Sequence, residues 1–367
     1  MVDIESNRQN GQHEPISIFG RAFIRENVTS QVIFWITSLG ITAKGLYKLY
    51  RVFDPTIQQD SPHSRGVVKY ELIYTQLHSI SFGLIILHFK FNRSMYLKYL
   101  DIYQTIVRSN FGLASNGFKK RCIKINRFFL VFATIYEMLT TSVNHYLSDR
   151  PTDFSIVFFV ELILMAFALF GYVFSMQFII ECCTYSQSSF KPLNNLLDSL
   201  LNKSLPNNMN SIAKSLRLYY SKTVESVRIM DKFLAFAIFV FYLYFTGHCI
   251  LIVGEILDAS RCSIYYTLWM IFRFFGESSY LVLITYHLVC VNQSSTRIFD
   301  KVYQLSFSLD SSHSIVTMNE INLFLLRTNR NDVGFTFAGL CMVSPSFVSS
   351  LATISLTLGL ALPSFIK

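Results

Sequence analysis

Residues 333–367 read VGFTFAGLCMVSPSFVSSLATISLTLGLALPSFIK and carry no charged side chain before Lys367. From Ser346 to Ile366 the stretch is long enough to cross the hydrocarbon core of a bilayer, which takes about 20 residues of helix. Many of its residues are small or hydroxylated, and such residues let helices pack closely or let water wet one side of a helix. The stretch predicts a membrane-spanning helix that has either a small packing face or a wet face.

The composition of the whole chain agrees with a membrane protein. Of 367 residues, 51% are hydrophobic and only 15% are charged, with a mean hydropathy of +0.38. Soluble chains carry about a quarter charged residues. We therefore expect an all-α polytopic membrane protein and interpret the net charge of +9 as a signal of topology, not of nucleic-acid binding. Seven spans are predicted, at residues 31–53, 67–89, 128–146, 154–183, 233–254, 264–290 and 346–366.

Lysine and arginine in the connections predict the orientation. The N-terminal segment and the second, fourth and sixth connections hold 23 of them, and the other side holds only Arg65, Arg150, Arg261 and Lys367. Positive residues stay in the cytoplasm. We therefore expect the N-terminus inside and the C-terminus outside. Residues 1–30 lack the apolar core of a cleaved signal peptide.

This orientation is opposite to that of G-protein-coupled receptors, which are the main alternative class. The seven cysteines form an odd, mostly intramembrane set that predicts no disulfide framework. A transporter is a second alternative, but no internal repeat supports it. The sequence contains no phosphate-binding glycine loop, no zinc-binding His-Glu-x-x-His and no Gly-x-Ser-x-Gly, so no enzyme, metal or cofactor is expected.

Ionisable residues inside the spans are candidate site residues, because each is costly in lipid and tends to face a cavity or a partner. Arg273 and Glu277 are four residues apart and either neutralise one another or contact a ligand. Glu161 and His248 have no local partner and must find one across the bundle or in a wet pocket. Trp269 is either an interface residue or a pocket wall. The candidate ligand-binding residues are Glu137, Glu161, Tyr244, His248, Trp269 and Arg273.

The connections on the predicted inner side show helical patterns. Leucines 193, 196, 197, 200 and 201 form an apolar stripe at helical spacing, and after the break at Pro206 a second helix is expected from Ile212 to Met230. Residues 321–326 show a shorter apolar stretch of the same kind. From the residues alone, these helices are expected to lie on the inner membrane surface, where basic residues meet anionic lipid.

The last span resembles the end of insect gustatory receptors. That family carries Thr-Tyr, five apolar residues and Gln-Phe; here Thr357 matches the Thr and Phe365 the final Phe, whereas Leu358 replaces the Tyr and Ser364 the Gln. Residues 335–340 are similar to the family's short helix that leads into this span. The seven-span plan and the order of the loops extend the resemblance over the whole chain.

The resemblance implies a ligand-gated, non-selective cation channel for taste compounds, in the plasma membrane of chemosensory neurons. It implies a homo- or heterotetramer joined by a cytoplasmic anchor, with a small-molecule tastant and membrane lipid as partners. Because Phe365 matches the final Phe of the family motif, the resemblance implies that it forms an apolar constriction that gates by dewetting. We expect four parts: a cytoplasmic segment at 1–30, a ligand-binding bundle at 31–292, the anchor at 293–345 and a pore-lining helix at 346–367. The pore and gate candidates are Thr357, Leu358, Ala361, Ser364 and Phe365.

Overall fold

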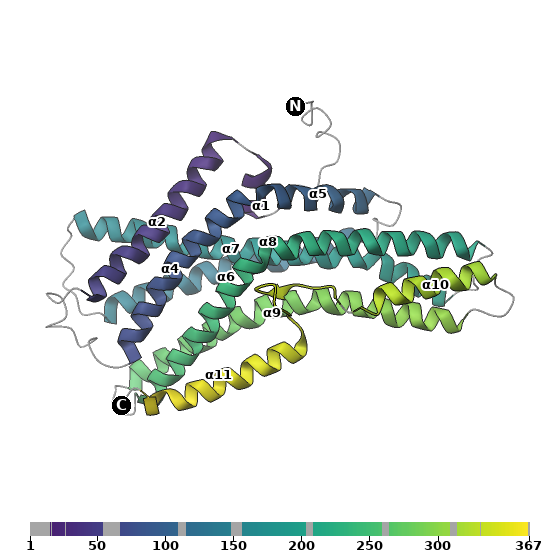
Figure 1. The fold of residues 1–367 in the computed structure, drawn as a ribbon. Coiled ribbons are helices and arrows are strands. Elements are labelled where there is room, and N and C mark those ends of the chain that lie inside the picture. Colours follow the sequence, from purple (N-terminus) through teal and green to yellow (C-terminus); the bar gives the residue numbers. More distant parts are fainter. Residues whose placement is uncertain are drawn as a thin grey trace.

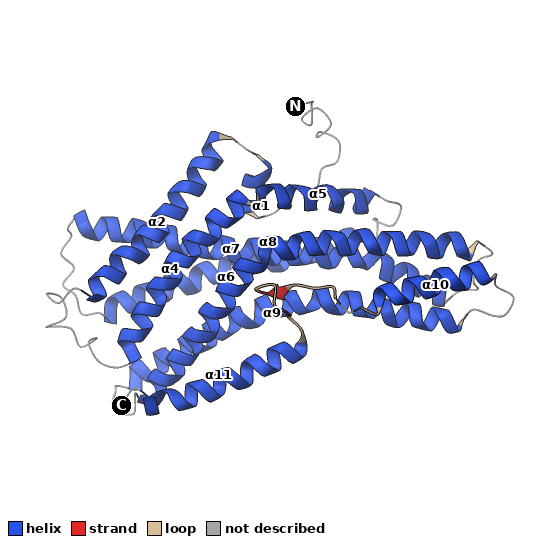
Figure 2. Ribbon diagram, viewed as in Figure 1, coloured by secondary structure: helices blue, strands red, loops and turns tan. Residues whose placement is uncertain are grey.

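The structure is a computed structural model that describes residues 15, 17–25, 27–53, 67–108, 115–147, 156–202, 208–258, 264–308, 314–330 and 332–365. These residues are almost all helical, with one short β-hairpin (Figure 2). The elements in chain order are α1 (Ile18–Ile24), α2 (Val28–Phe53), α4 (Val67–Phe91), α5 (Arg93–Arg108), α6 (Ser115–Leu147), α7 (Ile156–Leu201), α8 (Met209–Asp258), α9 (Ile264–Phe307), α10 (Ile315–Thr328), β1 (Thr336–Phe337), β2 (Cys341–Met342) and α11 (Pro345–Phe365).

Several helices are much longer than a bilayer is thick. Helix α8 has 50 residues and α7 has 46, so at 1.5 Å per residue they measure about 75 and 70 Å. The hydrocarbon core measures only about 30 Å. The predicted helices in the fourth connection are therefore the ends of α7 and α8, and they continue the membrane spans without a break.

Within the described residues, four helices are long and apolar enough to cross a membrane: α4, α7, α8 and α9. Helix α11 has a shorter apolar part, Pro345–Ala361, and α2 is interrupted by Lys44, Lys48 and Arg51. The all-α polytopic class is confirmed. The number of seven spans and their orientation stay predictions.

The helices are arranged around α7, α8 and α9, which pack on one another along their length (Figure 1). Helix α2 packs on α4 and α7 at one side of the bundle, and α11 packs on α8 at the other. Helix α10 lies on α8 and α9 at the end of the bundle that is far from the C-terminus. The core contains many aromatic rings; Phe89, Phe178 and Phe233, for example, are all fully buried with ring centroids 5.2 to 6.0 Å apart.

Residues 335–340 do not form the predicted short helix. They belong to the β1–β2 hairpin, in which Thr336 pairs with Met342. Ala338 (φ 55°) and Gly339 (φ 73°) both have left-handed backbone conformations, which turn the chain back and cannot continue a right-handed helix. Asp231 of α8 holds the hairpin, because its Oδ1 accepts hydrogen bonds from Thr336 N (2.7 Å) and Oγ1 (2.9 Å). The short helix of this region is instead α10, which Ser314 caps.

Candidate functional site

Five ionisable side chains meet inside the bundle, where the start of α4, the end of α8 and the start of α9 come together. Glu71 lies on α4, His248 and Glu255 on α8, and Arg273 and Glu277 on α9, and all five residues are buried. We call these five residues the buried charge cluster.

Glu71 is at the centre of the buried charge cluster. Its Oε1 accepts a hydrogen bond from Arg273 Nη2 at 2.6 Å and another from His248 Nε2 at 2.9 Å. The other ring nitrogen of His248, Nδ1, lies 3.5 Å from Glu277 Oε1. The Tyr266 hydroxyl donates to Glu255 Oε2 at 3.1 Å. Burial makes each unpaired charge expensive, and these contacts between helices offset that cost.

Aromatic rings continue from the cluster toward the middle of the bundle. The Tyr244 ring lies 5.3 Å from His248, 4.9 Å from His78 and 5.5 Å from Phe82, centroid to centroid. Apolar rings with polar edges therefore lie beside the cluster, and these are the side chains that small-molecule sites usually contain.

Several buried polar atoms in this region have no hydrogen-bond partner among the described residues. They are Gln76 Oε1, His78 Nδ1, Thr246 Oγ1, His248 Nδ1, Glu255 Oε1, Arg273 Nε and Glu277 Oε2. A buried polar atom without a partner costs about 1–3 kcal/mol, so a group of them indicates a place that takes water or a polar ligand. No group of three or more His, Cys, Asp or Glu in the described part of the chain is arranged to hold a metal ion.

Helix α11 has two different faces. Gly359 is buried against α8, where a Cβ atom would lie 3.3 Å from Val253 Cγ1. On the opposite face, spacings of four, three and four residues align Ser346, Ser350, Thr353 and Thr357, and all four are exposed. We call this the hydroxyl face. The Thr353 and Thr357 hydroxyls donate to the carbonyl four residues earlier, at 3.0 and 2.9 Å, and their oxygens keep lone pairs for water.

Comparison with solved structures shows what this arrangement is similar to. The insect olfactory receptor OR5 from Machilis hrabei, in complex with eugenol, matches over 92% of this chain and 89% of its own, with a TM-score of 0.64 and 13% identity. A second structure of the insect olfactory receptor OR5 from Machilis hrabei matches over 92% of this chain and 90% of its own, with a TM-score of 0.59 and 13% identity. The chain has the fold of an insect olfactory receptor. No family model matches the sequence, and no curated protein matches it significantly.

Within this fold, the structure brings together some of the predicted site residues. His248 and Arg273 belong to the buried charge cluster, and the Tyr244 ring lies beside His248. Trp269 stacks on Phe272 at 5.5 Å. Glu137 lies on α6 and Glu161 on α7, but their side chains are outside the described residues, as are those of Ser364 and Phe365. Leu358 is exposed and Ala361 is half-buried on α11.

Arg273 and Glu277, which are four residues apart on α9, each contact a different helix. Arg273 forms its ion pair with Glu71 on α4, and Glu277 faces His248 on α8. The closest charged contact of each of these two residues is therefore with another helix. His248 finds its partners across the bundle, as expected.

Sequence reasoning missed Glu71 and Glu255. The sequence alone could have identified Glu71 as a candidate site residue, because it is an acidic residue inside the predicted span at 67–89. Glu255 is one residue beyond the predicted end of the fifth span, so its burial depends on how far α8 continues.

Proposed function

We propose that the protein is a gustatory-receptor-like chemosensory receptor that works as a ligand-gated, non-selective cation channel in the plasma membrane. The hydroxyl face of α11 is the observation that carries the proposal. The fold and the resemblance of the last span to gustatory receptors support the same function.

The hydroxyl face of α11 is exposed, and this supports a pore. A helix surrounded by lipid gains nothing from a row of serine and threonine that points away from its own bundle. The same row is suited to water and partly hydrated cations, provided that other subunits face it across a channel. In this proposal Thr357 and Ala361 line the pore, and Ser364 and Phe365 form its outer constriction.

The buried polar atoms near the cluster that have no hydrogen-bond partner in the described part of the chain support a ligand-binding site. Eugenol in OR5 is a small aromatic compound with polar oxygens. In this chain, a taste compound would bind between aromatic walls such as Tyr244 and take hydrogen bonds from the buried charge cluster. Ligand binding opens the pore only if it favours the open state over the closed state.

The exposed apolar face of α10 supports assembly with other subunits. This helix buries Thr317, Ile321, Phe324 and Thr328 on its own bundle. Its opposite face exposes Ile315 (76%), Val316 (58%), Leu323 (48%) and Leu326 (67%). Apolar side chains outside the membrane favour a partner surface. The proposed partners are identical or related subunits, in a tetramer.

The test is current in a heterologous cell to which no G protein is added. Phe365→Ala is expected to widen the constriction and give cation current without ligand. The matched control is Leu356→Ala, an exposed leucine on a different side of α11 that should leave the channel closed.

Silence of Phe365→Ala at normal surface expression would refute the pore assignment. Current that appears only when a G protein is supplied would instead support the G-protein-coupled alternative.

A further inference from the structure

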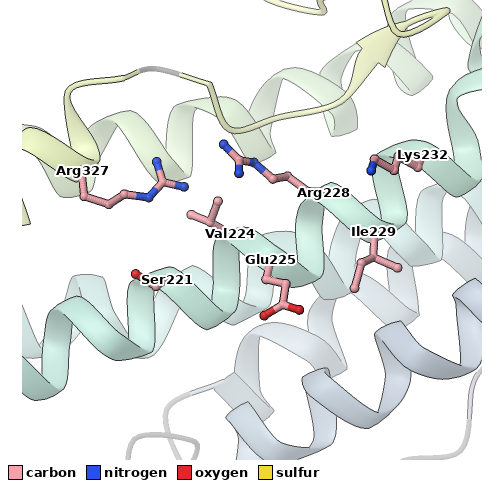
Figure 3. A pocket seen from close by; sticks show the side chains of 7 residues that line it. All are labelled: Ser221, Val224, Glu225, Arg228, Ile229, Lys232 and Arg327. Carbon is pink, nitrogen blue, oxygen red and sulfur yellow. The ribbon is translucent and has the colours of Figure 1, made fainter.

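A shallow groove of about 250 Å³ runs along the part of α8 that precedes its apolar stretch, far from the buried charge cluster (Figure 3). Ser221, Val224, Glu225, Arg228, Ile229 and Lys232 line it from α8, and Arg327 lines it from α10. We call it the basic groove. Figure 3 shows the guanidinium groups of Arg228 and Arg327 pointing toward one another, with the Glu225 carboxylate directed away from both.

One carboxylate holds the two arginines together. Arg327 Nη1 donates to Asp332 Oδ1 at 3.3 Å, and Arg228 pairs with Asp332 Oδ2. The guanidinium of Arg327 also lies over the Tyr220 ring at 5.9 Å, and the hydroxyl group of Tyr220 is 2.9 Å from Ser295 Oγ. The groove is therefore prearranged, and the Arg228 side chain is still 51% exposed and open to a further anion.

The local charge favours an anion. Arg228, Arg327 and Lys232 supply three positive charges in the groove, against Asp332 between the arginines and Glu225 on the far side. Partial burial opposes ionisation of Asp332, but the hydrogen bond from Arg327 and the charges of both arginines lower its pKa below the usual value. The carboxylate is thus ionised at neutral pH and occupies a position that suits any oxyanion.

The position along α8 points to the membrane surface. Lys232 is followed directly by Phe233, and no Asp, Glu, Lys or Arg occurs again before Glu255. Among the described helices that are long and apolar enough to cross a membrane, α8 has the most apolar stretch. Lys232 therefore lies where hydrocarbon gives way to headgroups, on the side that the lysine and arginine count assigns to the cytoplasm.

We propose that Arg228, Lys232 and Arg327 bind the phosphorylated headgroup of an anionic membrane lipid. Paired guanidinium groups match phosphate oxygens by bidentate hydrogen bonds, and basic clusters beside a membrane span bind multiply phosphorylated inositol lipids. The lipid phosphate competes with Asp332 for the two arginines. Because Asp332 begins the segment that leads through the β1–β2 hairpin to α11, occupancy of the groove acts on the connection to the last helix.

The test uses the purified full-length chain and measures its affinity for phosphatidylinositol bisphosphate in phosphatidylcholine vesicles. Arg228→Gln, Lys232→Gln and Arg327→Gln are each expected to weaken binding about fivefold, the usual effect of one basic residue near a membrane. Asp332→Asn is expected to strengthen binding, because it removes the competing carboxylate. Lys232 is exposed, so its substitution is informative even if an arginine variant fails to fold.

Arg217→Gln is the matched control. Arg217 also joins α8 to α10, through an ion pair with Glu320 at 3.0 Å, but it lies outside the groove, so its loss should leave lipid affinity unchanged. Equal affinity of all variants for the lipid would overturn the proposal. Equal affinity of the native chain for free inositol trisphosphate and for the lipid would also overturn it, because the groove would then be a site for a soluble phosphate.

Discussion

Replacing Arg273 by methionine tests whether the buried charge cluster is held together by its ion pairs in a water-poor interior. The substitution keeps much of the side-chain volume and removes the partner that lies 2.6 Å from Glu71. The side chains of Arg273 and Glu71 are only 11% and 12% exposed. Removing one member of a buried pair costs about 3–5 kcal/mol, because the other charge loses its main compensation.

The assay is the apparent Tm of the detergent-solubilised chain, measured by size-exclusion chromatography after heating at one fixed rate, because such unfolding is often irreversible. At about 2 °C per kcal/mol, Arg273→Met should lower the Tm by roughly 6–10 °C. The double variant Glu71→Gln with Arg273→Met should recover much of this loss, since neither charge then remains unpaired.

The matched control is Arg217→Met, which breaks the ion pair with Glu320. That pair has a similar distance, 3.0 Å, but its side chains are 28% and 19% exposed. More exposed pairs contribute only about 0–1 kcal/mol. A Tm loss for Arg273→Met as small as that of Arg217→Met would refute the reasoning, because the cluster would then be well hydrated.

Three further predictions concern topology, packing and the pore. The chain has four glycosylation sequons, at Asn27, Asn92, Asn202 and Asn292. All four lie on the predicted cytoplasmic side, so deglycosylation should not change gel mobility; Asn292 is also buried, with its amide donating to the Val333 carbonyl at 3.0 Å. A shift that disappears when one of these asparagines is replaced would reverse the orientation. Gly359→Leu should push α11 away from α8 and cost about 1–3 kcal/mol of stability, measured as Tm, whereas an unchanged Tm would contradict the close packing. A cysteine at Thr357 should react with external thiol reagents and block the current, and a cysteine at Leu356 should not; equal reactivity at both positions would argue against a pore-lining hydroxyl face.

The sequence by itself was sufficient for the class of protein and for the start of several apolar helices. Inside a bilayer every backbone polar group must be satisfied within the chain, so each long apolar run has to be a helix. The expected starts at 67, 264 and 346 lie within one residue of those of α4, α9 and α11. The same energetic argument selected His248 and Arg273, because an ionisable residue in an apolar run needs a partner.

Only the tertiary structure decided which residues are those partners. Glu71 and His248 are 177 residues apart in sequence, and their contact depends on how α4 and α8 are rotated and shifted against each other. From their spacing along one helix, an ion pair between Arg273 and Glu277 was as plausible as a ligand contact. In the structure, the charged groups nearest to these two residues come from other helices. The left-handed turn at Ala338 and Gly339, in residues that resemble a family helix, was likewise invisible to helical periodicity.

The direction of the hydroxyl face was also decided by packing. The pattern of Ser346, Ser350, Thr353 and Thr357 shows that they share one side of α11, and a small-residue stripe fits a packing face as well as a wet one. Gly359 contacts α8, so the side of α11 that carries Gly359 faces the bundle. The hydroxyl face, on the other side of α11, therefore points away from the bundle. Periodicity determines which residues lie together on a helix, but the neighbouring helices determine where that side points.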